Sequence, residues 1–264
     1  MAARLRVSLK EKLKNGASVF GTWSILGSNE AIMVMYSAGL DFIIIDLEHP
    51  PTTYETAQNH VFSMVGTNCT PIIRLGENNE LSTLRALETG VQSIMISHIS
   101  SVAEAEKLVM SSKYYPKGQR GLSPFTLHHQ YSDNNMAQKL IDANEQQFIG
   151  VLIEGEDGLN DLENIAKIDE IDMIYLGIYD VSQALGVPGD VSNDKVIKLL
   201  KDCVKISDEN GKTAGSVAPD KNYLSTLINS GFRFISYRND SFVLGDGLKK
   251  AKNHYSNTIS EMSK

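Results

Sequence analysis

The feature that most constrains the fold of this chain is a repeated alternation of strand-like and helix-like segments. Short apolar runs rich in β-branched residues are typical of strands buried on both faces of a parallel sheet. Eight strands are predicted, at Val19–Trp23, Phe42–Leu47, Pro71–Leu75, Ser93–Ser97, Phe148–Ile153, Met173–Gly177, Thr213–Val217 and Phe232–Ser236. Helices are predicted at Asn29–Ala38, Thr53–Thr67, Asn79–Glu88, Ala103–Ser112, Met136–Asn144, Leu159–Ile168, Asp194–Asn210, Lys221–Ser230 and Asp240–Lys264.

Eight strand and helix units with short connections predict an α/β fold, the (β/α)8 TIM barrel. A length of 264 residues suits one such barrel, so residues 1–264 are expected to form a single domain. One connection, residues 113–135, is unusually long, and loops of that length are usually functional or disordered. Because it contains tyrosine, proline and arginine, we expect an ordered loop near the barrel mouth.

Composition limits the classes of partner. The formal net charge is -7 and no basic stripe is present, which argues against nucleic-acid binding. No apolar run approaches the roughly 18 residues of a membrane span, and the N-terminus lacks the apolar core of a signal peptide. Cys69 and Cys203 are far apart without metal-binding spacing, so both are expected to be free thiols. The protein is therefore predicted to be cytoplasmic, with neither nucleic acid nor membrane as partner.

Ionisable residues lie at the carboxyl ends of several predicted strands, the edge at which α/β barrels place their active sites. They are Asp46 and His49 after the second strand, Arg74 in the third, Glu154 after the fifth and Asp180 after the sixth. Each alone fits a helix cap, a surface ion pair or a structural histidine, but together they predict one shared site. His49 is taken as the only histidine at a strand end, where an imidazole can transfer protons near neutral pH.

Glu154 and Asp180 follow neighbouring strands, so their carboxylates are expected to face the same space. Two carboxylates that lie close together either share a proton or bind a cation. With only two oxygen-donor side chains, water and substrate would complete the coordination, which suits Mg²⁺ or Mn²⁺. Arg74 supplies a guanidinium that can bind a carboxylate or stabilise an oxyanion, or that could pair with Glu77 at the surface.

Longer segments of the chain carry a resemblance to a known family. They are GTW at residues 21–23, AGLDFIIIDLEH, PIIRL, ALETG, YYPKGQRG, IEGEDGLNDLENIA, LGIYDVSQALGVPG and GFRFIS, in that order. The sequence resembles the HpcH/HpaI-type class II pyruvate aldolases, a family that is similar to 2-dehydro-3-deoxyglucarate aldolase, 4-hydroxy-2-oxoheptanedioate aldolase and macrophomate synthase. The resemblance covers most of the chain.

The resemblance implies a (β/α)8 barrel assembled as a homohexamer, a trimer of dimers, with a C-terminal helix exchanged between subunits. It implies Glu154 and Asp180 as ligands of a divalent metal ion, Mg²⁺ or Mn²⁺, with Co²⁺ or Zn²⁺ as alternatives. The reaction implied is reversible cleavage of a 4-hydroxy-2-keto acid, expected to be derived from a sugar, into pyruvate or a related 2-keto acid and an aldehyde. No lysine Schiff base is required.

The resemblance also assigns the remaining site residues. Arg74 would face the keto acid, and His49 would be the acid/base, with Glu88 standing where the family has an aspartate that pairs with the histidine. Asp46 would support that end of the pocket. The substrate-binding walls would be Trp23, Gly177, Ile178, Tyr179, Ser216 and Val217.

Several positions depart from the family pattern. The chain has Leu152 where the family has glutamine, and it has Ile178 and Tyr179 where the family has a proline-containing turn. Ser97 and His98 replace a valine–proline strand end. These departures predict altered substrate choice. They leave open another carbon–carbon lyase, such as an oxaloacetate decarboxylase or a citrate-lyase-like acyl-CoA enzyme, and a non-catalytic binding protein that retains the fold.

Overall fold

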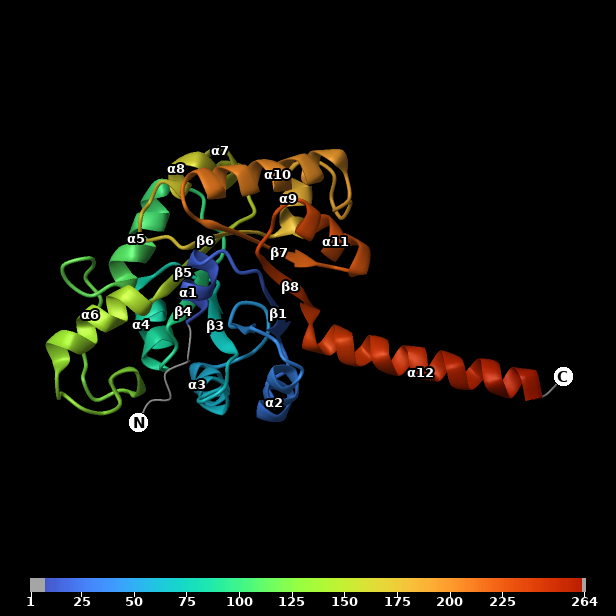
Figure 1. The fold of residues 1–264 in the computed structure, drawn as a ribbon, viewed down its shortest axis with the longest axis horizontal. Helices are drawn as coiled ribbons and strands as arrows, with labels where there is room; N and C mark the ends of the chain where they lie inside the picture. The colour runs from blue at the N-terminus through green and yellow to red at the C-terminus, as the bar shows by residue number, and fades with distance from the viewer. Residues whose placement is uncertain (1–7, 263–264) are drawn as a thin grey trace.

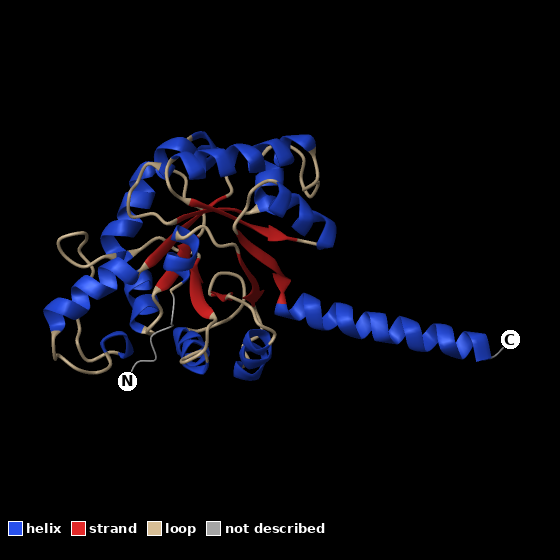
Figure 2. Cartoon of the chain, in the orientation of Figure 1, coloured by secondary structure: helices blue, strands red, loops and turns tan. Residues whose placement is uncertain are grey.

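The computed structural model describes residues 8–262, in which eight parallel strands close into a barrel in sequential order (Figures 1 and 2). The predicted (β/α)8 TIM barrel is confirmed. The strands are β1 (Val19–Ser24), β2 (Phe42–Asp46), β3 (Thr70–Leu75), β4 (Ser93–Ile96), β5 (Phe148–Ile153), β6 (Met173–Leu176), β7 (Thr213–Ala218) and β8 (Phe234–Asn239).

Most of the helices cover the outside of the barrel (Figure 2). The helical elements of the described residues are α1 (Leu9–Lys14), α2 (Asn29–Ser37), α3 (Tyr54–Ser63), α4 (Glu80–Glu88), α5 (Val102–Ser112), the 3₁₀ turn η1 (Leu127–His129), α6 (Met136–Gln146), α7 (Glu156–Asn160), α8 (Leu162–Ala166), α9 (Ile178–Ala184), α10 (Asp194–Glu209), α11 (Lys221–Asn229) and α12 (Asp240–Met262). The sequence did not predict α1 or α9, and the helix predicted at Leu159–Ile168 is two short helices that meet at Asp161. The last two residues of the final predicted helix lie outside the described residues.

The barrel interior is packed with side chains from alternate strand positions, as the period of two in a strand requires. Phe42 and Phe234 stack with their ring centroids 3.9 Å apart. Leu9 and Leu13 of α1 join this interior cluster beside Val19, at the amino ends of the strands. A ligand can therefore enter only at the opposite, carboxyl end, which is called the mouth below.

The loop at residues 113–135 lies at the amino ends of the strands, so the expectation that it lies near the mouth is wrong. The reason is geometric, because α5 runs antiparallel to the strands and the chain leaves it at the amino ends. Arg120 of this loop bonds to Glu88, at the end of α4. Leu127 lies against Gly90, just before β4 begins.

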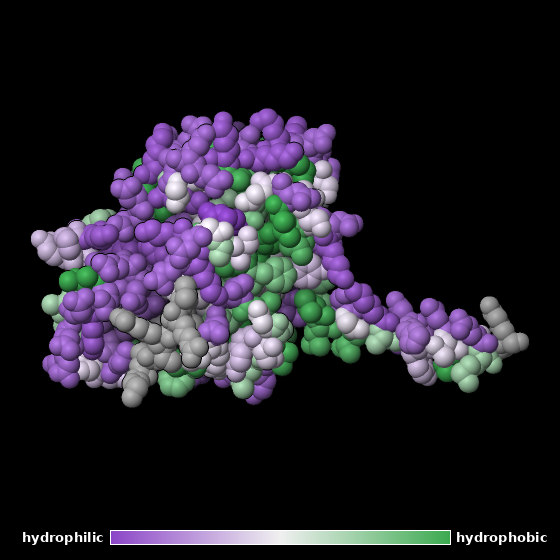
Figure 3. Space-filling model, in the orientation of Figure 1, coloured by the Kyte–Doolittle hydropathy of each residue, from purple (hydrophilic) through white to green (hydrophobic). Residues whose placement is uncertain are grey.

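The C-terminal helix α12 extends away from the barrel (Figure 1). Its first residue, Asp240, is buried and accepts hydrogen bonds from Ser24 Oγ and from the N–H groups of Ile25 and Leu26. Apolar residues gather where the helix leaves the barrel (Figure 3). The exposed apolar residues of α12 are Phe242, Val243, Leu244, Leu248, Tyr255, Ile259 and Met262. Among the described residues, no helix combines the length and apolar composition that a bilayer-spanning segment requires.

Candidate active site

The strand register brings Asp46 and Arg74 together at the mouth. The two residues are partners in the parallel pairing of β2 with β3. Each lies two positions after an inward-facing isoleucine, Ile44 or Ile72, so both side chains point inward. Arg74 donates to Asp46 through Nε, at 2.8 Å, and through Nη2. Its Nη1 lies 3.1 Å from Oε2 of Glu48. Arg74 is buried, with 7% of its surface exposed, and the two carboxylates together contact all three nitrogen atoms of its guanidinium.

Trp23 forms a floor beneath Arg74. The guanidinium carbon lies 4.5 Å from the centre of the Trp23 ring, within the range of a cation–π contact. The indole N–H donates to Ser236 Oγ at 2.8 Å, and this hydroxyl lies 2.7 Å from the hydroxyl of Tyr175. Burial raises the pKa of Tyr175, so its hydroxyl keeps its proton. These bonds fix the orientation of the ring on which Arg74 rests.

A continuous chain of polar contacts runs from Arg74 to Glu154 through Glu48 and His98. Oε2 of Glu48 accepts a hydrogen bond from Ser97 Oγ, and Oε1 of Glu48 lies 2.9 Å from Nε2 of His98. The other ring nitrogen of His98, Nδ1, lies 2.8 Å from Oε1 of Glu154. The backbone N–H of His98 donates to the same oxygen at 3.1 Å. The ends of β2, β3, β4 and β5 are thus linked by side chains.

Glu154 and Asp180 interact electrostatically. Burial raises the pKa of Glu154, His98 opposes the shift, and the negative charge of Asp180 adds to it. Gly177, the residue before α9, leaves room for the carboxylate, because a Cβ there would lie 2.7 Å from Oε2 of Glu154. Asp180 lies in the first turn of α9, where it is exposed and accepts a hydrogen bond from Gln183. It is therefore not the N-cap that a purely structural role predicted.

These donors fit a divalent ion bound mainly by oxygen. The two carboxylates repel one another, so a cation between them would relieve the repulsion. Within residues 8–262, no three His, Cys, Asp or Glu side chains already converge closely enough to enclose an ion. Two carboxylates with the remaining positions open are the arrangement expected when water and substrate supply the other ligands.

His49 and Glu88 do not meet within one chain. His49 is exposed on the turn after β2, and within the described residues it has no hydrogen bond or ion pair. Glu88 is at the far end of α4 and accepts a hydrogen bond from Arg120 at 2.9 Å. A contact between them would require a second copy of the chain.

The predicted pocket walls divide between the inside and the outside of the barrel. Ser216 is fully buried and donates to the carbonyl of Leu176, and Ile178 is fully buried in the core between barrel and helices. Neither side chain can line the mouth, so these two assignments are wrong. The physical reason for Ser216 is the alternation in β7, which points Val217 inward and Ser216 outward. Tyr179 is 48% exposed on α9.

Sequence reasoning gave no role at the mouth to three residues there: it left Glu48 unassigned, and it named Ser97 and His98 only as departures from the family pattern. Glu48 is next to His49, and its side chain lies against Gly76, where a Cβ would come within 2.7 Å of it. His98 comes two residues after β4 ends, so His49 is not the only histidine at a strand end. The signal that could have found His98 was its place directly after the predicted strand Ser93–Ser97.

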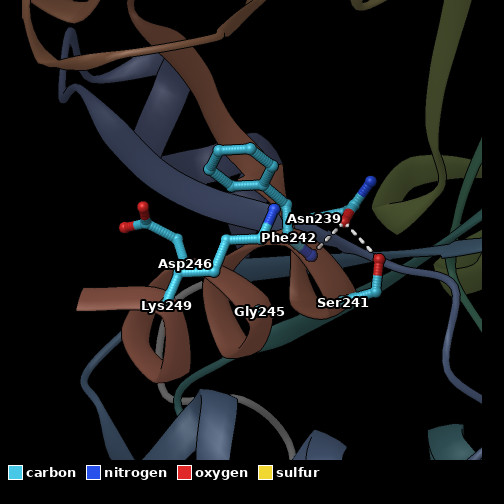
Figure 4. Close-up of a pocket in the computed structure, with 6 residues that line it drawn as sticks. All are labelled: Asn239, Ser241, Phe242, Gly245, Asp246 and Lys249. Carbon is cyan, nitrogen blue, oxygen red and sulfur yellow. Dashed lines mark hydrogen bonds between the residues drawn. The ribbon is translucent and has the colours of Figure 1, made fainter. Parts of the chain in front are cut away.

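Two cavities elsewhere hold none of the predicted site residues. One, of about 340 Å³, lies at the start of α12, lined by Asn239, Ser241, Phe242, Gly245, Asp246 and Lys249 (Figure 4). In it, Asn239 Oδ1 accepts hydrogen bonds from Ser241 Oγ and the Phe242 N–H, so this oxygen serves to begin the helix. The other, of about 440 Å³, is lined by Ser192, Ile197, Asp220, Asn222, Tyr223 and Thr226.

Known proteins resemble this chain over nearly its whole length. A pyruvate aldolase of Rhizobium etli is 26% identical, and the match covers 90% of this chain and 93% of that protein. A 4-hydroxy-2-oxovalerate aldolase of Novosphingobium aromaticivorans is 28% identical, and the match covers 92% of this chain and 94% of that protein.

Solved structures share the fold. An HpcH/HpaI aldolase/citrate lyase family protein from Burkholderia cenocepacia superposes with a TM-score of 0.89 at 23% identity, over 94% of this chain and 98% of that one. A citrate lyase beta subunit from M. tuberculosis, complexed with oxaloacetate and magnesium, gives a TM-score of 0.57 at 15% identity, over 87% and 95%. The family model described as HpcH/HpaI aldolase/citrate lyase matches residues 20–245, and the chain belongs to that family.

Proposed function

We propose that the protein is a metal-dependent aldolase that cleaves and forms 4-hydroxy-2-keto acids at the mouth of the barrel, giving pyruvate or a related 2-keto acid and an aldehyde. Family membership and the aldolase relatives, which cover at least nine-tenths of the chain, support an aldehyde-lyase. The residues at the mouth support the requirement for a metal.

The observation that carries the proposal is the charge at the mouth. At the mouth, the carboxylates of Asp46, Glu48, Glu154 and Asp180 outnumber the guanidinium of Arg74, which pairs with the first two. When all four are ionised and His98 is neutral, they exceed the charge of Arg74 by three. A 2-keto acid is itself an anion and would be repelled. A divalent cation beside Glu154 and Asp180 removes most of this excess, so substrate binding and metal binding are coupled.

When bound, the ion would supply a Lewis acid for the keto group and counter-charge for an enolate. The chain supplies the rest. Arg74, held in plane by Asp46 and Glu48, presents its remaining N–H groups toward the mouth as donors for a carboxylate or an oxyanion. Trp23 closes the floor beneath it and excludes water from that side.

His49 would transfer the proton of the C4 hydroxyl, with Glu88 of a second copy as its partner. Glu88 uses Oε1 for Arg120, while its Oε2 is buried and has no hydrogen-bond partner among the described residues. A buried acceptor without a donor is costly, so a donor from a neighbouring chain would satisfy it. The exposed position of His49 suits such a contact.

The exposed apolar side chains of α12 also support an oligomer. A helix of 23 residues with apolar side chains in water is marginal by itself and gains stability when a neighbour covers those side chains. We propose a homohexamer, a trimer of dimers, with α12 exchanged between subunits. Light scattering coupled to size exclusion would test it, because deletion of residues 245–264 should yield smaller particles.

The deciding experiment is exchange of pyruvate methyl protons with deuterium oxide, followed by NMR with and without Mg²⁺ or Mn²⁺. Metal-dependent exchange is expected. Metal-dependent release of CO₂ from oxaloacetate without use of any aldehyde would instead assign the site to a decarboxylase. No exchange together with no metal binding would leave a binding protein with an aldolase fold.

A further inference from the structure

Arg238 lies at the carboxyl end of β8, on the rim of the mouth, in a backbone conformation that few arginines adopt. Its φ is 50°, in the left-handed region that residues other than glycine seldom occupy. Two positions earlier in β8, Ser236 faces the barrel interior and accepts the indole N–H of Trp23. Backbone strain of this kind is concentrated at functional sites, which makes Arg238 a candidate for a role at the mouth.

A β-bulge redirects the chain at Arg238. In the pairing of β8 with β1, Ser236 lies opposite Gly21 and Asn239 lies opposite Trp23, so β8 has one residue more than β1 over this stretch. The extra residue falls between Ser236 and Asn239, the stretch that holds Arg238. Bulges are common at the rims of barrels and beside active sites, where they change the direction of a side chain.

The guanidinium of Arg238 is stacked on an aromatic ring but is not paired with an acceptor. Its central carbon lies 3.9 Å from the centre of the ring of Phe242, in the first turn of α12. Within residues 8–262, its Nε is buried without a hydrogen-bond partner. The neighbouring carboxylate, that of Asp240, accepts the N–H groups of Ile25 and Leu26 instead. A buried donor without an acceptor is costly, so an acceptor from a bound ligand would stabilise it.

Arg238 lies on the side of the mouth away from the proposed metal site. The groups proposed to hold the ion and the keto acid come from β2, β3, the end of β5 and α9. The other side is formed by the adjacent strands β7, β8 and β1, in which Arg238 is the one charged residue and to which Val217 and Trp23 give an apolar lining. Phe242 also lines the cavity at the start of α12, so open space adjoins the stacked guanidinium (Figure 4).

We propose that Arg238 is a specificity residue that selects aldehydes with an anionic far end, a carboxylate or a phosphate. The inference rests on the proposed function, which places the keto acid against Arg74 and leaves the side of β7, β8 and β1 to the aldehyde. The N–H groups of a guanidinium match carboxylate and phosphate oxygens in pairs. The contact with Phe242 orients these N–H groups before the ligand binds, which lowers the entropic cost of pairing.

The test compares aldol addition of pyruvate to matched aldehydes in the presence of Mg²⁺ or Mn²⁺. The compounds 4-oxobutanoate and its methyl ester differ in charge at the far end, and so do glyceraldehyde 3-phosphate and glyceraldehyde. The variants Arg238→Gly and Arg238→Asn both remove the guanidinium and tolerate a left-handed backbone, so the second serves if the first folds poorly. Thermal unfolding shows whether each variant is folded.

The unaltered protein should prefer at least one of the anionic aldehydes to its neutral partner. For that anionic aldehyde, both variants should lower kcat/KM at least about tenfold, mainly through KM, because a charged hydrogen bond is lost. For the neutral partner, kcat/KM should change less than about threefold. Lys221→Asn is the matched control, because it removes an exposed cation from the start of α11, at the same end of the barrel, and it should change neither value.

Proton exchange of pyruvate needs no aldehyde, so it separates this inference from the proposed function. Both Arg238 variants should keep that exchange within about threefold of the unaltered protein. An effect confined to the carboxylate or to the phosphate would support the proposal and identify the anion. Equal use of charged and neutral partners by the unaltered protein, or equal losses for both in the variants, would overturn the role of Arg238 and leave the aldolase proposal standing. Absence of exchange in the unaltered protein would overturn both.

Discussion

Two regions of the molecule hold an arginine in nearly the same setting, and their difference is a reason for proposing the active site at the mouth. Arg74 at the mouth and Arg120 near the amino ends of the strands are both buried, and each lies 4.5 Å from an aromatic ring, Trp23 or Tyr114. Arg120 meets one carboxylate, Glu88. Arg74 contacts two carboxylates, those of Asp46 and Glu48, and Glu48 is connected through His98 to a third carboxylate, that of Glu154.

The comparison shows that local balance of charge separates a structural ion pair from a site that requires a ligand. The pair of Arg120 and Glu88 is neutral, and among the described residues it leaves Oε2 of Glu88 without a donor and Nε of Arg120 without an acceptor. The mouth keeps an excess of negative charge that no described side chain removes, and a fold tolerates such an excess where function requires it.

The largest expected effect is loss of catalysis when the excess charge at the mouth is reduced. Glu154→Gln or Asp180→Asn should lower metal-dependent pyruvate proton exchange and aldol cleavage on the order of 10³-fold, because the ion loses a charged ligand. Thermal unfolding should show both variants folded. Either variant with full activity would show that the mouth is not the metal site.

The next prediction tests the unpaired oxygen of Glu88. His49→Ala and Glu88→Gln should each lower turnover by about 10²-fold, the ordinary contribution of positioned proton transfer. If the two residues meet between copies, mixing the two inactive variants after mild dissociation should restore part of the activity, because some hybrid sites contain both native residues. Mixed samples as inactive as their components would place Glu88 outside the site.

A smaller effect concerns stability at the second arginine. Arg120→Ala should lower the free energy of unfolding by about 3 kcal/mol, because Glu88 is left partly buried without its cation. Chemical denaturation measures this loss. Lys198→Ala, which breaks an exposed pair with Asp202 on α10, is the control and should cost under about 0.5 kcal/mol. Equal losses in the two variants would mean that burial of Arg120 contributes nothing.

The smallest effect is a dependence of stability on pH. Burial raises the pKa of Glu154 above its usual 4.5, so the folded protein holds this proton more tightly than the unfolded chain. The contribution of Glu154 to the free energy of unfolding is fully present below pH 4.5 and is lost as the pH rises through the raised pKa. In EDTA, the melting temperature of Glu154→Gln should therefore rise relative to that of the unaltered protein as the pH rises, whereas that of Glu163→Gln, a change at an exposed residue of α8, should not.

The sequence predicted most of the barrel because each strand is a short apolar run, and strand boundaries follow where that run ends. It predicted Asp46, Arg74 and Glu154 at the mouth for the same reason, since each lies at or directly after the end of such a run. The sequence could not show that Glu48 rather than His49 turns inward, because that choice depends on the space at Gly76, the residue that directly follows β3.

Two further misses have the same origin in tertiary structure. The position of His98 depends on a left-handed backbone turn that no pattern of side chains announces. The long loop was assigned to the mouth from its composition, although the direction of α5 places it at the other end. In both cases the chain direction in three dimensions decided the outcome, and composition carried no information about it.

The attachment of α12 has a consequence for how the enzyme would respond to dilution. The helix is anchored through Asp240 at its first turn, and most of its remaining length is in contact with solvent. If neighbouring chains cover α12 as proposed, mass action links the concentration of the protein to its thermal stability, because association removes separate chains from the equilibrium. A concentrated sample should melt at a higher temperature than a dilute one.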